Sequence, residues 1–335
     1  MSQWTKLSRK AQFRIAVEVA RRRGASFART FPNVICVGAG FRSRGGEESL
    51  FDEVCLRFLV KRKWKSRIET SNSVPKYIRA HIMVAGTQRR VLIPTDVSEF
   101  RGGAPHLDLS GGITSRRDAT PLEFGAGCCM VRNAFSRNER YLLSCYHVFS
   151  PSLNDAPPNI DCVISDNGGR LGPMIEMADP ESTSNALDAA LALVEDVTVD
   201  NITAWGRMPT SHATDFDLFS LVKHYELFVH GRRIAPASAG FPAVTRTGPL
   251  SATFQSLFPT PLPFDYRQTA GKVLFFADTL QYIANVRPGD SGAAVMDSKG
   301  KLFGMHFYGQ GNVGYALSAP RLFDPGVFHF DIILS

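Results

Sequence analysis

The chain has 335 residues, of which 44% are hydrophobic and 21% charged, values typical of globular proteins with a sizeable core. No apolar run approaches the roughly 18 residues that span a bilayer, and Arg14 and Glu18 interrupt the first stretch, so it does not read as a signal peptide. These features exclude a disordered or membrane-spanning chain. They predict a cytoplasmic protein, with organelle targeting left open.

Positive charge is concentrated near the N-terminus. Residues 1–70 hold 16 Lys and Arg against 6 acidic residues, a net charge of +10, whereas the whole chain carries +7. Within this segment, residues 61–65 interleave Trp64 with four cations, and Arg67 follows. Such a run suits nucleic acid or an acidic partner protein, although a solvated strand end is the simpler interpretation.

The first part of the chain predicts a small α+β module. Its apolar residues at helical spacing, followed by Gly24, predict a basic amphipathic helix of about four turns that ends at that glycine. Strands are then predicted over residues 35–41, 54–60 and 90–94. Because residues 101–112 are polar and rich in glycine, they predict a linker. The chain therefore divides into an N-terminal module over 1–113 and a second domain over 114–335.

Beyond residue 113, short apolar runs alternate with Gly, Pro, Asn and Asp clusters, a pattern typical of a β-sandwich or barrel. His147 lies near the end of the apolar, strand-like run 141–149. Asp188 opens the apolar run 188–194. Taken singly, such a histidine is usually a core residue and such an aspartate a helix cap.

Ser291 lies in the tight turn Gly289-Asp290-Ser291-Gly292. A serine hydroxyl becomes a nucleophile only when a base takes its proton and a third group orients that base. The order histidine, aspartate, serine differs from the orders of α/β-hydrolases and subtilisins and fits the chymotrypsin arrangement. We therefore interpret His147, Asp188 and Ser291 together, although the turn alone would be ordinary.

Segments 144–147, 187–191 and 289–292 resemble the three catalytic segments of the trypsin-like, chymotrypsin-fold serine proteases. Segments 33–40 and 54–61 are similar to the leading part of the Narrow-leaf-type plant and bacterial trypsin-like proteases. The resemblance implies a mainly β fold: two antiparallel β-barrels, with the site in the cleft between them, and the small α+β module in front.

The resemblance also implies an activity, a serine endopeptidase that cleaves peptide bonds through an acyl-enzyme intermediate. Ser291 would attack the carbonyl, His147 would move the proton, and Asp188 would orient the imidazole. The backbone N–H groups of Gly289 and Ser291 would form the oxyanion hole. The substrate would be a protein or peptide, and neither cofactor nor metal is expected.

Four further residues are expected to shape the substrate pocket. Asn285 stands six residues before Ser291, at the place that resembles the pocket base, and its neutral side chain gives no support for an Arg or Lys preference. Phe307, Tyr308 and Gly309 lie on the strand that resembles the pocket wall. The bulky side chains of Phe307 and Tyr308 predict a small or medium uncharged substrate side chain.

Asp290 raises a separate question. In the digestive members of the resembled family, the corresponding aspartate receives a terminal amine released by cleavage of the precursor. No Ile-Val-Gly-Gly-like segment opens the second domain here, so we expect no obligatory cut. The sequence does not identify the group that pairs with Asp290.

The six cysteines show neither a CxxC pair nor zinc-like spacing with histidines. Secreted trypsins carry a cysteine directly after the histidine, where this chain has Val148, so we infer a reducing compartment. A thiol nucleophile at Cys145 is one alternative. Others are a weak pseudoprotease that binds peptides in the cleft, or a basic scaffold for partner proteins or nucleic acid. Homo-oligomerisation is compatible with the sequence.

Overall fold

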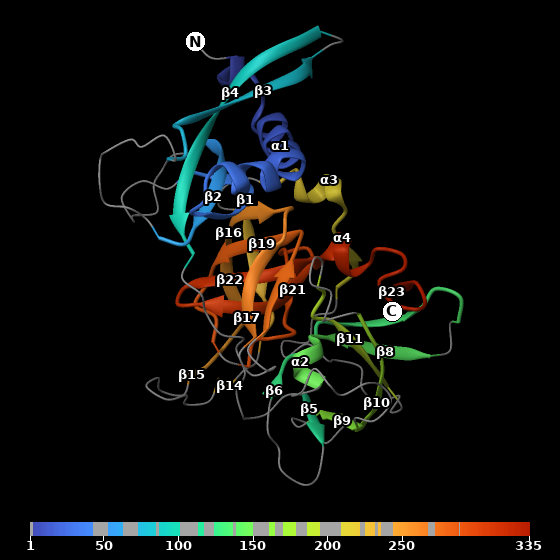
Figure 1. Ribbon diagram of the computed structural model, residues 1–335. Coiled ribbons are helices and arrows are strands. Elements are labelled where there is room, and N and C mark those ends of the chain that lie inside the picture. The colour runs from blue at the N-terminus through green and yellow to red at the C-terminus, as the bar shows by residue number, and fades with distance from the viewer. Residues whose placement is uncertain are drawn as a thin grey trace.

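The computed structural model shows the arrangement of most of the chain (Figure 1). It describes residues 3–42, 53–62, 73–84, 87–100, 113–116, 124–136, 139–149, 161–164, 170–178, 186–194, 209–221, 225–231, 234–235, 244–266, 272–287 and 289–335. The predicted linker over 101–112 and most of the run of cations at 61–67 therefore lie outside the described residues.

A short 3-10 helix, η1 (Gln3–Lys6), precedes α1 (Arg9–Thr30), whose apolar face is buried as predicted. The predicted end at Gly24 is wrong, because α1 continues to Thr30. Gly24 is buried against Thr260, and a Cβ there would lie 2.6 Å from its methyl carbon. The glycine therefore permits close packing of the helix and does not terminate it.

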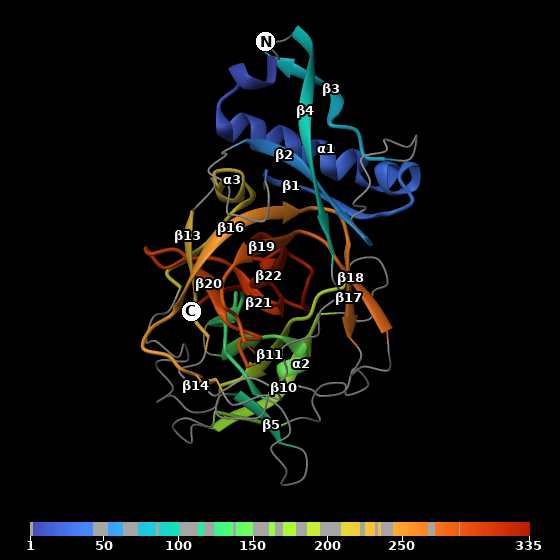
Figure 2. The same cartoon turned by 90° about the vertical axis from the view of Figure 1, so that its left-hand side faces the viewer.

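Four strands follow α1: β1 (Val34–Phe41), β2 (Val54–Val60), β3 (Tyr77–Val84) and β4 (Thr87–Glu99). The three predicted strands match β1, β2 and the middle of β4, whereas β3 was not predicted. β2 pairs antiparallel with β1 and parallel with β4, and β3 and β4 form an antiparallel hairpin. Figure 2 shows the long β4 running from this hairpin down beside α1 and the barrel.

A closed barrel of antiparallel strands forms the centre of the molecule. Its strands are β13 (Glu226–Val229), β20 (Ala294–Met296), β21 (Lys301–Gln310), β22 (Val313–Ser318), β19 (Thr279–Ile283) and β16 (Leu250–Phe258). Each strand pairs with the next in this order, and β13 pairs with β16 to close the ring. Around it lie β12 (Ser211–His212), α3 (Asp215–Leu218) and α4 (Ala319–Leu322).

The N-terminal strands extend the sheet of this barrel, since β1 pairs with β16. A buried arginine in β2 connects the N-terminal strands to two strands of the barrel. Arg57 in β2 donates to Ser256 Oγ in β16 at 2.9 Å and to Gln281 Oε1 in β19 at 3.1 Å. Strand pairing and polar contacts therefore join β1–β4 to the barrel through one shared sheet.

A second antiparallel sheet lies below the barrel in Figure 1. In spatial order it contains β23 (Ile332–Leu334), β7 (Cys129–Asn133), β8 (Arg140–Ser144), β11 (Ala190–Leu193), β10 (Arg170–Met177), β9 (Asp161–Ile164), β5 (Ile113–Arg116) and β6 (Phe124–Gly125). The hairpins β14 (Ile234–Ala235) with β15 (Val244–Thr245) and β17 (Leu262–Tyr266) with β18 (Lys272–Phe276) complete the fold. This topology confirms the predicted mainly β, chymotrypsin-like fold class.

No helix within the described ranges is both long and apolar enough to cross a membrane. Five cysteines, Cys36, Cys55, Cys128, Cys129 and Cys145, are free thiols buried in the interior. Burial raises the pKa of the Cys36 thiol to about 12. These thiols pack as small apolar groups, as expected from the strand-like runs that hold them.

Candidate active site

His147 lies on a helical turn and not on a strand, which corrects the expectation from its apolar run. Strand β8 ends at Ser144, and the chain then forms α2 (Tyr146–Phe149). The Val148 N–H donates to the Cys145 carbonyl at 3.1 Å, while all four α2 side chains are buried. An apolar run of this length suits a buried helical turn as well as a strand, so the pattern alone did not distinguish them.

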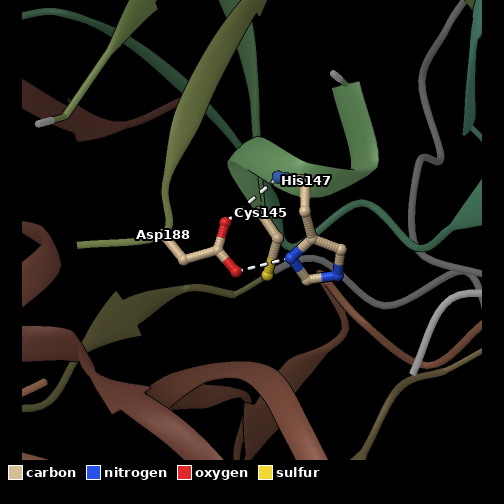
Figure 3. Close-up of side chains that lie close together, drawn as sticks. All are labelled: Cys145, His147 and Asp188. Carbon is tan, nitrogen blue, oxygen red and sulfur yellow. Dashed lines mark hydrogen bonds and ion pairs between the residues drawn. The ribbon is translucent and has the colours of Figure 1, made fainter. Parts of the chain in front are cut away.

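Asp188 contacts His147 through both carboxylate oxygens. Oδ2 lies 2.5 Å from His147 Nδ1, and Oδ1 accepts the His147 backbone N–H at 3.1 Å (Figure 3). Sheet register brings the two together, because β11 pairs with β8 through Ala190 opposite Ser144, and Asp188 and His147 lie just beyond that pair. Asp188 is 2% exposed, so a double contact shielded from water fixes the orientation of the imidazole.

Ser291 lies in a turn that only glycine accommodates at two positions. Gly289 and Gly292 both have φ of 87°, in the left-handed region. A Cβ on Gly292 would collide with the Ala126 carbonyl oxygen and the Ser144 hydroxyl. The turn therefore packs tightly against the other sheet, and Ser291 Oγ donates to the Phe307 carbonyl at 3.5 Å.

A short segment joins the serine turn to the histidine helix. The Ala126 N–H donates to the Ser291 carbonyl at 2.7 Å, and the Ser144 hydroxyl donates to the Ala126 carbonyl at 2.7 Å. A Cβ on Gly125 would collide with Val148 of α2 and lie 2.7 Å from the Ser291 carbonyl oxygen. The structure thus bonds Asp188 to His147 and places the Ser291 turn against the segment that flanks α2.

Cys145 lies beside the histidine and the aspartate, and one ligand atom from each of the three residues falls within 4.8 Å of the others (Figure 3). Its thiol donates to the His306 carbonyl at 3.3 Å. Burial, and then the charge of Asp188, raise the pKa of this thiol well above its ordinary value. The sulfur is therefore held as a thiol, a poor nucleophile.

Cysteine, histidine and aspartate are all metal-binding residue types, and the spacing of these three side chains tests whether they fit one ion. Two tetrahedral zinc ligands with bonds near 2.1 Å would lie about 3.4 Å apart. His147 Nδ1 and Asp188 Oδ2 are 2.5 Å apart. That separation is a hydrogen bond, so the pair does not fit two ligands of one ion.

The partner of Asp290, which the sequence left open, is Arg246. Its guanidinium donates to both carboxylate oxygens of Asp290, at 2.5 and 2.8 Å. The Arg287 N–H adds a bond of 2.8 Å to the same carboxylate. No motif around Arg246 indicates this role, because the contact depends on a hairpin that folds back onto the turn.

A buried histidine bonds to the backbone of the turn, and a buried tyrosine pairs with that histidine. Tyr282 Oη lies 2.6 Å from His306 Nδ1, and the His306 carbonyl accepts the Gly292 N–H at 2.8 Å. Both side chains are fully buried. The environment of His306 is that of a core residue. The pairing with Tyr282 had no sequence signal.

The residues expected in the substrate pocket fall in two environments. Asn285 is exposed in the segment after β19. The side chains of Phe307 and Tyr308 are buried, with ring centroids 4.9 and 4.5 Å from that of Phe264, and Gly309 follows them in β21. Since the Phe307 carbonyl faces Ser291 Oγ, β21 passes directly beside the serine. The pocket and the oxyanion hole remain predictions.

The chain matches no protein-family model and no curated protein. Among solved structures, it is similar to the active form of the Rv3671c protease from M. tuberculosis, with 16% identity and a TM-score of 0.38 over 63% of this chain and 75% of that one. It is also similar to the HRV-C 3C protein with rupintrivir, with 12% identity and a TM-score of 0.34 over 66% of this chain and 94% of that one. At such scores these likenesses carry no argument about activity.

Proposed function

We propose that this protein is a serine endopeptidase that cleaves peptide bonds through an acyl-enzyme intermediate. The observation that carries the proposal is the buried contact of Asp188 with His147, at 2.5 Å to Nδ1 and 3.1 Å to the backbone N–H. An imidazole held in this way at Nδ1 presents Nε2 as a base. The serine turn packs against the segment that flanks the helix carrying that imidazole.

The reaction would begin when Ser291 Oγ attacks the substrate carbonyl and His147 Nε2 takes the hydroxyl proton. A tetrahedral intermediate forms, with its oxyanion bound by the N–H groups of Gly289 and Ser291. His147 then gives the proton to the leaving amine. Water attacks the resulting ester by the same sequence of transfers and releases the acid and the free serine.

Serine is favoured over cysteine as the nucleophile because of what surrounds Cys145. Its thiol already donates to the His306 carbonyl at 3.3 Å, and its pKa is raised by burial and by Asp188. Attack by sulfur requires the thiolate. Ser291, by contrast, stands between two glycines in the left-handed conformation, in a turn whose N–H groups would serve the oxyanion.

Labelling with a fluorophosphonate tests the proposal, because the reagent phosphonylates a serine only when a neighbouring base activates it. We expect the intact chain to be labelled at Ser291, located by mass spectrometry of its peptides. Ser291→Ala and His147→Ala should remove the label. Two matched variants on exposed positions of the same chain, Ser251→Ala and His81→Ala, should keep it.

A wild-type chain that stays unlabelled and cleaves no member of a proteome-derived peptide mixture would overturn the proposal. That result would favour the pseudoprotease, which binds peptides without cleaving them. The same mixture would report the side chain preferred next to the cleaved bond, for which a small or medium uncharged residue is proposed. The narrower likeness to the Narrow-leaf-type proteases remains part of this proposal.

Partners beyond the substrate are a separate proposal, based on charge. Arg9, Arg14 and Arg23 are exposed on α1, while Arg21 pairs with Asp278 at 3.4 Å. This surface supports binding of nucleic acid or an acidic protein. Retention on DNA that weakens with salt and survives Ser291→Ala would support it, and salt-independent behaviour would contradict it.

A further inference from the structure

Asp290, in the turn that carries Ser291, forms a buried ion pair with Arg246. Neither side chain takes part in the proposed proton transfers. Arg246 Nη1 and Nη2 bond Asp290 Oδ1 and Oδ2 at 2.5 and 2.8 Å, a two-pronged contact of guanidinium and carboxylate. The Arg246 side chain is 6% exposed and that of Asp290 is 2% exposed. Paired bonds of this kind are the most directional that a carboxylate makes in a protein.

The surroundings enclose this pair on several sides. Arg246 follows β15 at the end of the β14–β15 hairpin and precedes β16 of the barrel. Gly231, just after β13, packs against both groups. A Cβ there would collide with Asp290 Oδ1 and lie 2.9 Å from Arg246 Nη1. A larger residue at 231 would therefore displace the guanidinium or the carboxylate.

Asp290 connects this pair to the backbone of the serine turn. Its carboxylate accepts the Arg287 N–H at 2.8 Å, and its own N–H donates to the Arg287 carbonyl at 3.1 Å. Its carbonyl accepts the Ala293 N–H at 2.9 Å. A shift of the Asp290 side chain would therefore move the backbone of Gly289 and Ser291, the proposed oxyanion donors.

We propose that Arg246 is a positioning residue that holds the nucleophile turn in its reactive form. It supplies, from within the chain, the cation that the buried Asp290 carboxylate requires. This inference rests on the proposed function and specifies how its site is held ready. The turn would adopt its reactive form as the chain folds, without a terminal amine released by cleavage.

The physical reason is the cost of a buried charge that has lost its partner. Without the guanidinium, the Asp290 carboxylate must take up a proton or turn toward water. Either change removes the restraint on the turn. Displacement of catalytic groups by about 1 Å is enough to lower a rate about 100-fold.

The test measures the rate of fluorophosphonate labelling at Ser291 in the full chain. Arg246→Met keeps the unbranched stem of the side chain but removes the guanidinium and its charge, and we expect labelling to slow about 100-fold. Arg246→Lys should fall between this variant and the wild type, because an ammonium cannot make both bonds at once. Arg57→Met is the matched control, since it removes another buried arginine, on β2, distant in the sequence from the serine turn.

Two further measurements separate positioning from general destabilisation. Adding Asp290→Asn to Arg246→Met removes the unpaired charge and should recover part of the rate. Guanidinium at non-denaturing concentration should raise the labelling rate of Arg246→Ala up to a plateau, because that variant leaves space for the ion. The labelling rate of the wild type should not change. If Arg246→Met does not fold, the lysine and double variants provide the same comparison.

The outcomes distinguish this inference from the proposed function. A wild-type chain that is not labelled overturns both. If the wild type is labelled and Arg246→Met is labelled within threefold of the wild-type rate, the positioning role alone is overturned. A loss in Arg246→Met no greater than that in Arg57→Met would likewise assign the arginine a purely structural role.

Discussion

Replacing Asp188 by asparagine removes one negative charge and almost no volume from the centre of the site. In the native chain Oδ1 accepts the His147 backbone N–H at 3.1 Å, and Oδ2 lies 2.5 Å from Nδ1. In the variant the amide oxygen must keep accepting the backbone N–H. The amide NH2 then faces Nδ1, which can only accept from it, so the ring proton moves to Nε2. In the proposed reaction, Nε2 could then no longer take a proton from Ser291.

The expected loss of activity is large because two effects act together. The imidazole is held in the unproductive tautomer, and the imidazolium formed during the reaction loses its counterion. Asp188 is 2% exposed, so water cannot replace the missing carboxylate. The equivalent change in the trypsin-like catalytic triad costs about 10⁴-fold in kcat. This factor corresponds to about 5 kcal/mol of transition-state stabilisation.

The assay compares kcat/KM on a cleaved peptide, together with the fluorophosphonate labelling rate, for wild type, Asp188→Asn and Asp297→Asn. Asp297 is a matched control because it is also a buried aspartate, 6% exposed, whose carboxylate accepts bonds from Tyr225 and from backbone N–H groups. Thermal unfolding establishes that each variant is folded. If Asp188→Asn retained activity within tenfold of the wild type, the assignment of Asp188 as the group that orients His147 would be wrong.

Further predictions concern the turn, the thiol and the junction with the N-terminal strands. Gly292→Ala should lower the free energy of unfolding by about 3 kcal/mol and abolish labelling, because its φ of 87° and the collision with Ala126 both oppose a Cβ. Gly248→Ala, with no atom within 4 Å of the added carbon, should be neutral in urea denaturation. Since the pKa of the Cys145 thiol is raised, its thiolate stays scarce through neutral pH and becomes available only at strongly alkaline pH. Iodoacetamide at pH 7.5 should therefore leave fluorophosphonate labelling intact, and rapid inactivation would contradict the assignment. Arg57→Met should lower the free energy of unfolding by about 2 kcal/mol while labelling per folded molecule persists. A chain of residues 114–335 alone should be poorly soluble, since it exposes the edge of β16 that pairs with β1 and the part of β16 that α1 contacts, and a soluble, fully active fragment would refute this.

The strands and the candidate catalytic residues could be predicted from the sequence where their signals are local. Residues 54–60 are apolar apart from Arg57, and the structure has a buried strand over the same range. Ser291 stands between glycines that the structure uses at positive φ. The pairing of His147 with Asp188 followed from their order and local context, and the structure places both oxygens of the carboxylate on the histidine.

Tertiary structure alone decided the features that depend on segments far apart in the chain. Arg246 and Asp290 are separated by 44 positions, and only closure of the hairpin and the barrel brings them together. Gly24 has the local sequence of a helix end, yet packing against Thr260 makes it an interior contact of α1. The shared sheet of β1 and β16 likewise has no local signal. Sequence patterns reflect backbone preference and the alternation of apolar residues, which act over a few positions. The partners of a buried charge or of a close-packed glycine are set by how the whole chain folds.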